Sequence, residues 1–552
     1  MKIFIQSGWI IVFACFSGFV LATEQEVSSV PESQVELPVQ VPAKVDRVYV
    51  EPTFVVSGFQ IEGPALIDRE RILSLLVGFV DRPITFSELR QATEAVERLH
   101  GLAGFEVVRV LIPEQELAPN SKLTLQILDA RLDLITVKNN QFFSSEQMTR
   151  EVHVLRQGVL LNTHDMDKNL RLVNQNPART VQVALEPGDE PGLVNATINV
   201  QDSEPLVGFV TLDNTGTNAT GDFRLGAVVQ HNNLFTRGHS GSFQVVTSPG
   251  HWSDVKVYGL TYQMPLYALD SLLEYAINDS SVNAGALAVG GTNLMINGAG
   301  TSQTLRLTRV MNRIQGFDPR LSLSFEHKKF VSQVQVNGTG PSLVPNTASF
   351  PVGLTLLLKS EQPNVQQAFS VGYFRNAFQS GENSTAQYQL SNAAADANFD
   401  LIKLNASWSG PVFSTWRYSV KLDAQFSDFS LISGEQFGSG GVYSVRGFEE
   451  RVLSGDSGFR QSFEMLGPNW SKKIHSSLDR FRMVLFAEAA QVRLNSAVNV
   501  ASEPHIASFG AGFRFAFTPN QQINLDLARV VSGVESQPHG DVMLHFSFAT
   551  AL

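Results

Sequence analysis

Residues 416–426 read WRYSVKLDAQF, in which apolar side chains alternate without a break with polar or charged ones. Successive side chains of an extended strand point to opposite faces, so this segment has one apolar and one polar face. A period of two held over about ten residues is typical of a strand that crosses a membrane between lipid and an aqueous lumen. The apolar face is Trp416, Tyr418, Val420, Leu422, Ala424 and Phe426, and the polar face is Arg417, Ser419, Lys421, Asp423 and Gln425.

The same alternation recurs from Pro205 to the C-terminus, in segments separated by turn-rich stretches. Residues 507–517 are a second clear example, with Phe509, Phe513 and Phe517 on one face. We count about sixteen such segments and expect no helix among them; an even number closes a barrel with both of its ends on one side of the membrane. The segments begin near residues 206, 223, 239, 252, 271, 301, 320, 347, 364, 396, 416, 457, 479, 506, 521 and 541.

A soluble β-sandwich would show the same alternation, but a sandwich domain holds about 100 residues, whereas these segments extend over roughly 350. Only 17% of the residues are charged, although the hydrophobic fraction is an ordinary 43%. That balance results when barrel strands give alternate residues to lipid and to a polar lumen. The sequence therefore predicts a transmembrane β-barrel of about 16 antiparallel strands over residues 205–552.

The N-terminus is predicted to be a secretory signal peptide over residues 1–22. Lys2 precedes an apolar run from Trp9 to Leu21, and residues 20–22 fit a small-residue cleavage site. Lipidation of Cys15 is the alternative, although Phe13 and Ala14 before it fit a lipoprotein signal poorly. Residues 23–52 are rich in Pro, Val, Glu and Ser without a sustained period, and are predicted to be a linker.

The composition excludes several classes of protein. Cys15 is the single cysteine, so cleavage of the signal would leave no disulfide, thiolate metal site or cysteine nucleophile. The net charge of −11 argues against a nucleic-acid partner, because nucleic-acid binders present basic surfaces. The balance of apolar and polar residues also excludes a polytopic helical membrane protein and a disordered chain.

Two smaller modules are predicted before the barrel, over residues 53–129 and 130–202. Each reads strand, helix, helix, strand, strand, so a period of roughly 75 residues occurs twice. Thr85 followed by Glu88 predicts a capping box at the second helix of the first module. Each α+β module would leave a strand edge able to pair with an extended peptide. The alternative is a single two-layer domain with no peptide role.

No catalytic, metal or cofactor site is predicted. Residues 455–458 (GDSG) are similar to the nucleophile loop of chymotrypsin-like proteases, but no suitable His and Asp context accompanies them. His164, Asp165 and Asp167 stand at a predicted helix start, where such residues usually cap the helix or complement its dipole. No phosphate-binding glycine loop follows a strand and opens a helix.

Several motifs resemble those of the two-partner secretion transporters, the TpsB or hemolysin secretion/activation family (ShlB, FhaC and HecB), which belong to the BamA-like superfamily. Residues 174–181 (NQNPARTV) resemble the end of the family's second periplasmic POTRA module, and residues 112–117 (IPEQEL) resemble their counterpart in the first. Residues 213–216 (DNTG) and 232–235 (NNLF) resemble the opening barrel hairpin. The resemblance covers residues 54–552 and implies that the two modules are POTRA domains.

A further motif concerns one long loop. Glu435 to Phe437, Gly440, Gly441 and the tetrapeptide of Val445, Arg446, Gly447 and Phe448 resemble the family's loop that folds back into the lumen, here about 431–456. The resemblance implies that Arg446 pairs with an acid on an inward-facing strand, within a pattern of Phe, any residue, Asp, any residue, Gly. The matching stretch starts at Phe486 and offers Glu488, with Ala490 in place of the glycine. The alternative is that Arg446 is a solvated loop cation.

The resemblance implies an outer-membrane translocator of a Gram-negative bacterium, with its POTRA modules in the periplasm. Its partners would be a secreted TpsA-type exoprotein, outer-membrane lipid and, during biogenesis, the barrel assembly machinery. The exoprotein would bind the POTRA modules unfolded and leave through the barrel. The alternatives are an assembly factor that inserts other barrels and a general diffusion porin.

Overall fold

The computed structural model describes residues 51–552 except 117–120, 191, 218–219, 282–284, 290–291, 297–298, 332–343, 414 and 496–502. The predicted signal peptide and residues 23–50 of the predicted linker lie outside the described residues. Residues Thr53–Leu552 form one compact unit.

The first module is a three-stranded sheet against which two helices pack. The parallel pair β2 and β5 forms the sheet with β4, and its core is shared with α1 and α2. The predicted capping box is present, because Thr85 Oγ1 accepts a hydrogen bond from the Glu88 amide and the Glu88 carboxylate accepts one from the Thr85 amide. The elements are β1 (Thr53–Val55), β2 (Gly58–Glu62), α1 (Arg69–Leu76), η1 (Val77–Phe79), β3 (Pro83–Thr85), α2 (Phe86–Leu102), β4 (Arg109–Leu111) and β5 (Lys122–Leu128).

The second module repeats this arrangement, with sheet order β6-β8-β7 and a parallel β6–β8 pair. Ser144 caps α3 and Asn162 caps α4 by accepting hydrogen bonds from the free amides of each first turn. The module has its own apolar core, which includes Phe143, Met148 and Val173. The elements are β6 (Arg131–Lys138), α3 (Ser145–Glu151), α4 (Thr163–Val173), β7 (Arg179–Pro187) and β8 (Leu193–Asp202).

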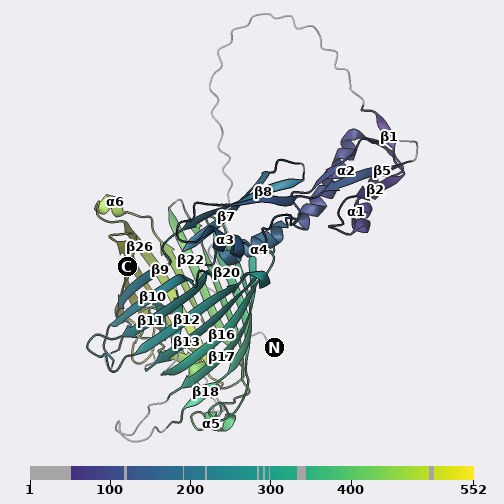
Figure 1. Cartoon of the computed structure of the whole chain (residues 1–552). Coiled ribbons are helices and arrows are strands. Elements are labelled where there is room, and N and C mark those ends of the chain that lie inside the picture. Colours follow the sequence, from purple (N-terminus) through teal and green to yellow (C-terminus); the bar gives the residue numbers. More distant parts are fainter. Residues whose placement is uncertain are drawn as a thin grey trace, which may run out of the picture. The chain divides into compact units, whose positions relative to one another are not determined.

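The predicted barrel of sixteen strands is confirmed for the described residues (Figure 1). Each strand is antiparallel to its neighbours, β29 closes the ring on β9, and the short β18 (Thr347–Ser349) leads into β19. The strands are β9 (Leu206–Asp213), β10 (Arg224–Leu234), β11 (His239–Thr247), β12 (Val257–Leu266), β13 (Ser271–Ser280), β16 (Gly300–Val310), β17 (Asp318–Phe330), β19 (Pro351–Glu361), β20 (Gln366–Asn376), β21 (Asp400–Val412), β22 (Trp416–Phe426), β25 (Ser457–Leu466), β26 (Arg480–Arg493), β27 (His505–Ala516), β28 (Gln521–Ser532) and β29 (Val542–Ala551).

Burial separates the two faces of each strand as the alternation predicts. On β26, Leu485 is exposed on the outer face, whereas Val484 and Phe486 on the lumen side are buried. Phe509 and Phe513 of β27 are likewise exposed outward. An apolar outer surface is what a barrel presents to hydrocarbon, and the closed ring satisfies every backbone pair within the wall.

The expectation of no helix after Pro205 is wrong. Helix α5 (Thr385–Gln389) lies between β20 and β21, and α6 (Ser471–Ile474) lies between β25 and β26. The first is capped by Ser384 and buries Tyr388 in a small apolar cluster, so tertiary packing stabilises a helix too short to show a helical period. The hairpin of β14 (Gly285–Val289) and β15 (Thr292–Ile296) was also not predicted. No helix in the described part of the chain has the length and hydropathy needed to cross a membrane.

A buried ion pair within the second module is contacted by a barrel side chain. The side chains of Glu151 and Arg179 are 1% and 0% exposed, and Arg179 Nη2 donates to the Glu151 carboxylate. The hydroxyl of Tyr267, in the β12–β13 turn, donates to Glu151 Oε2 at 2.7 Å. Burial, together with the charge of Glu151, raises the pKa of Tyr267, so the phenol stays protonated and keeps donating.

The second module also contacts the β16–β17 turn, where Arg171 Nη2 donates to the Met311 carbonyl at 2.7 Å. Both contacted turns lie at the end of the barrel where β9 begins. We call it the module-facing end. Strands β22 and β26 also begin there, because adjacent strands alternate in direction from β9 onward.

Candidate functional site

The connection between β22 and β25 folds into the lumen and forms the candidate site. This inward loop, residues 427–456 in the structure, contains η3 (Ser433–Glu435) and a small hairpin of β23 (Phe437–Ser439) and β24 (Leu453–Gly455). Its tip residues Val445 and Phe448 are fully buried, and they pack against Val492, Ile506 and Val530 of the wall. Apolar burial therefore holds the tip inside the barrel.

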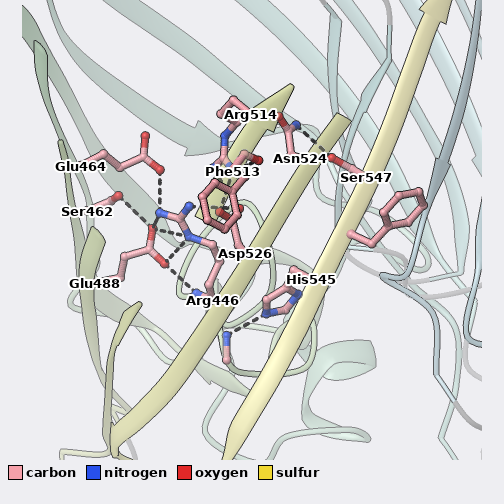
Figure 2. Close-up of polar contacts among 12 residues, drawn as sticks. Arg446, Ser462, Glu464, Glu488, Phe513, Arg514, Asn524, Asp526, His545 and Ser547 are labelled. Atoms are coloured by element: carbon pink, nitrogen blue, oxygen red, sulfur yellow. Dashed lines mark hydrogen bonds and ion pairs between the residues drawn. The ribbon is translucent and has the colours of Figure 1, made fainter. Parts of the chain in front are cut away.

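Arg446 lies at the tip and contacts Glu488 directly (Figure 2). Its Nε donates to both carboxylate oxygens of Glu488 at 3.1 Å, and its backbone amide donates to Oε2 at 2.7 Å. The guanidinium also lies over the ring of Phe486, 3.6 Å from the ring centre. The structure thus brings together Arg446, Phe486 and Glu488, and it does not leave Arg446 as a solvated cation.

Two further carboxylates surround the same guanidinium. Arg446 Nη2 donates to Glu464 Oε1 at 2.6 Å, and Nη1 donates to Asp526 Oδ2 at 3.3 Å. Asp526 also accepts two hydrogen bonds from Arg514, at 2.6 and 2.9 Å. Three carboxylates and two guanidinium groups therefore form one network, and charge-assisted bonds of this kind are about twice as strong as neutral ones.

Glu464 and Asp526 were not predicted as site residues. The signal was present, since both lie on the polar face of an alternating segment, as Glu488 does. The alternation tells which face of a strand a residue is on, but not how far along the barrel axis it lies. The strand register relative to Glu488 was needed to identify these two residues as part of the site. In the structure, Glu464 pairs across strands with Phe486, and Asp526 pairs with Gly512.

Gly447 is required by the backbone of the tip. Its φ is +93°, a region that residues with a Cβ rarely adopt, and a Cβ built there would lie 3.2 Å from Cβ of Ala528. The Gly447 amide donates to Nε2 of His545 at 2.8 Å. His545 was not predicted, and it holds the tip to the last strand (Figure 2).

Replacing Gly447 with alanine is therefore expected to loosen the tip by about 1 to 3 kcal/mol, the usual cost of an unfavourable φ. Limited proteolysis of the purified protein should show faster cleavage within residues 440–452. Gly540 is the matched control, because it also has a positive φ, +95°, but nothing lies within 4 Å of its built Cβ. Equal protease sensitivity of the two alanine variants would contradict a specific need for glycine in the tip.

The two ends of the inward loop, which we call its root, are held together by Asp456, which is fully buried. Its carboxylate accepts hydrogen bonds from the amides of Leu431 and Asn495, at 2.9 and 2.7 Å. Ser457 Oγ donates to the carbonyl of Ser427 at 3.0 Å. The GDSG stretch thus ties the two ends of the loop together, and both of its polar side chains are used in that role.

A second ion pair holds the root to another part of the wall. Glu435 is 3% exposed, and Lys328 Nζ of β17 donates to its two carboxylate oxygens at 3.1 and 3.2 Å. Ser349 Oγ of β18 donates to the same carboxylate at 2.6 Å. Strand β17 is six strands from β26 around the barrel, so the loop is fastened at two separated places.

No group of three or more His, Cys, Asp or Glu residues in the described ranges could hold a metal ion. A cavity of about 200 Å³ lies beside the tip, lined by Lys421, Arg446, Glu464, Glu488 and Asp526 among others. Its charged lining and its position between the loop and the wall suit polar contacts with a passing chain more than a small apolar ligand.

A protein-family model matches more than half of the chain. The model described as haemolysin secretion/activation protein ShlB/FhaC/HecB matches residues 193–515. That range includes most of the barrel and the whole inward loop.

Known proteins with similar sequences are transporters by name. The outer membrane transporter CdiB of Dickeya dadantii is 25% identical over 430 residues, which are 76% of this chain and 73% of that protein. The heme/hemopexin transporter protein HuxB of Haemophilus influenzae is 20% identical over 469 residues, 83% of this chain and 80% of that protein.

Solved structures show the same fold. CdiB from Escherichia coli superposes with a TM-score of 0.76 at 18% identity and covers 93% of each chain. CdiB from Acinetobacter baumannii gives a TM-score of 0.69 at 17% identity, over 92% of this chain and 91% of that one.

Proposed function

Because the chain belongs to the haemolysin secretion/activation family, we propose that it captures an unfolded exoprotein in the periplasm through its two POTRA modules and secretes it through the barrel. The chain is an outer-membrane transporter, with the modules in the periplasm. We propose three things beyond this: the exoprotein as partner, its binding site on the modules, and a role of the inward loop in transport.

The observation that carries the proposal is the inward loop. It lies inside the lumen and is fastened to the wall by ion pairs, which can exchange partners without covalent change. A general diffusion porin needs no such removable obstruction. A polypeptide that enters the lumen would displace the tip from Glu488 and Glu464, and the network would re-form after the chain has passed.

The second module supports capture of an extended chain. Strand β6 is an outer strand of its sheet, pairing with β8 along one side, while residues 158–160 pair with the start of its other side at Arg131 and Leu132. Beside it lies an open groove of about 610 Å³, lined by Ile135 of β6 and by Thr149 and Arg150 of α3 among others. A peptide added to a strand edge gains main-chain hydrogen bonds whatever its sequence, and side chains that enter an adjacent groove provide selection.

Filling this groove tests capture. Thr149→Trp places a large side chain in the groove from an exposed position of α3 and is expected to reduce secretion of the exoprotein by roughly tenfold, since the strand edge and the groove act together. His164→Trp is the matched control, because His164 is also exposed, lies on α4 and does not line the groove. Secretion of a large β-helical exoprotein encoded by a neighbouring gene is the readout.

Deleting the gene should leave that exoprotein inside the cell. Re-introducing the chain without residues 53–202 should restore a barrel in the outer membrane but no secretion. Normal secretion after the deletion would refute the proposed function. Loss of many unrelated barrel proteins from the outer membrane would instead identify an assembly factor.

A further inference from the structure

Most inward-facing carboxylates of the barrel wall have a basic partner. Glu274 pairs with Arg306 at 3.0 Å, Asp423 with Arg460 at 2.8 Å, and Glu326 with Lys328 at 2.9 Å. The acids around Arg446 are paired as well. Little free negative charge therefore faces the lumen from these strands.

Several inward-facing cations, by contrast, have no acidic partner within the described residues. Arg480 and Arg482 begin β26, and Nε of Arg482 is buried without any hydrogen-bond partner. Arg417 is the second residue of β22, and its side chain donates to the carbonyl of Asn364. Lys421, four residues further along β22, lines the cavity beside the inward loop. The lumen wall on β22 and β26 therefore carries surplus positive charge, although the chain has a net charge of −11.

The three arginines lie at one end of the barrel. Strands β22 and β26 both begin at the module-facing end, so Arg417, Arg480 and Arg482 lie at the periplasmic entrance and Lys421 lies deeper. The register also places Arg482 directly opposite Arg514 of β27. Like charges directly opposite each other destabilise a sheet, and only Arg514 is compensated, by Asp526. Arg482 therefore costs stability in the resting protein.

We propose that Arg417, Arg480, Arg482 and Lys421 form a basic entry wall that binds acidic side chains of the exported polypeptide as it enters from the periplasm. This inference rests on the proposed function and adds the chemistry of the cargo. Rings or walls of Arg and Lys select anions in pores, and a confined opening of one charge sign concentrates ligands of the opposite sign. The wall leads from the entrance to the cavity beside Arg446, so an acidic segment held there is presented to the inward loop.

Ion selectivity tests the wall without the exoprotein. In planar lipid bilayers with a KCl gradient, the full chain is expected to prefer chloride, and Arg480→Gln with Arg482→Gln should lower the permeability ratio of chloride to potassium by roughly twofold or more. Arg480→Lys with Arg482→Lys, which retains both positive charges, should keep the wild-type ratio. Arg90→Gln with Arg98→Gln is the matched control, because both arginines are exposed on α2 outside the barrel. Heat-modifiable migration would show that the variant with Arg480→Gln and Arg482→Gln still forms a folded barrel. If that folded variant keeps the wild-type permeability ratio, the proposal of an entry wall is refuted.

A polypeptide probe tests the cargo. Poly-L-glutamate added on the side of the POTRA modules should block the current, and the Gln double variant should need a concentration roughly tenfold higher for the same block, as expected on losing two charge-assisted contacts. Poly-L-lysine should not block. Equal block of the wild type and the variant by poly-L-glutamate overturns the inference, even if secretion is normal. If poly-L-glutamate blocks as expected but the chain does not secrete an exoprotein, the proposed secretion function is refuted and the entry wall is not.

Discussion

Replacing Arg446 with glutamate is expected to release the inward loop and to end secretion of the exoprotein. Among the residues that the structure describes, Arg446 is the one cation paired with Glu488, so the change removes that partner and adds a fourth carboxylate beside Glu464, Glu488 and Asp526. The side chains of Arg446 and Glu488 are each 4% exposed, and removing one partner of a buried pair costs about 3 to 5 kcal/mol. That cost shifts the docking equilibrium of the tip by roughly a hundredfold or more.

Labelling of an introduced cysteine measures release directly. Val445→Cys places a thiol at a position that is fully buried when the tip is docked, and the only natural cysteine lies in the predicted signal peptide. A maleimide should react slowly with this thiol in the otherwise unchanged chain and rapidly when Arg446 is glutamate. Slow labelling in both would show that the apolar contacts of the tip, and not Arg446, hold the loop.

The acidic partners of Arg446 should contribute unequally to the docking of the tip. Glu488→Gln is expected to resemble the loss of Arg446, whereas Glu464→Gln should have a smaller effect because the Glu464 side chain is 30% exposed and water can replace its contact. Exchanging Arg446 and Glu488 should restore only part of the function. The backbone amide of residue 446 would lose its carboxylate acceptor, and the new glutamate would face Glu464 and Asp526.

The second large effect is expected at the junction of the second module with the barrel. Arg179→Met leaves the buried carboxylate of Glu151 with neutral donors alone, from Gln147 and Tyr267, and should destabilise the module by about 3 to 5 kcal/mol. Hydrogen exchange of the full chain should then show faster exchange in α3 and β7. Adding Glu151→Leu should recover most of the loss, because replacing both partners of a buried pair by apolar groups is often neutral.

Arg131→Met is the control for this effect. Arg131 pairs with Asp129 at 2.7 Å, but its side chain is 52% exposed, and an exposed pair contributes about 0 to 1 kcal/mol. If Arg131→Met and Arg179→Met accelerated exchange equally, burial would not be the source of the stability at the junction.

Much of the barrel could be predicted from sequence, because a strand between lipid and water must alternate apolar and polar side chains. The predicted starts of β9, β11, β13, β22, β25 and β28 agree with the structure to the residue. The start near 252 precedes β12 at Val257, because residues 252–254 form a turn and the ladder begins only at Val257. Helix α5 could not be predicted, because burial of Tyr388 depends on Leu431 and Ile432, more than forty residues away.

The site was predictable in part for the same reason. Alternation on β26 places Glu488 toward the lumen, and the resemblance to a family supplied Arg446 as its partner. The pairing of Lys328 with Glu435 could not be predicted, because it joins residues 107 positions apart and the loop motif that contains Glu435 does not indicate a partner on β17. The pairing of inward-facing charges depends on the strand register and on the path of the loop. The residue pattern of a single strand gives no information on either.

The two fastenings of the inward loop have a mechanical consequence. A ring of sixteen strands is braced only by its own wall, and a wide ring deforms easily into an ellipse. The inward loop joins β17 at its root to β26 and β28 at its tip, and so acts as a crossbeam between distant parts of the circumference. When the tip detaches, the barrel loses an obstruction and a brace in the same step, so the pore should become wider and also more compliant while a polypeptide passes through it.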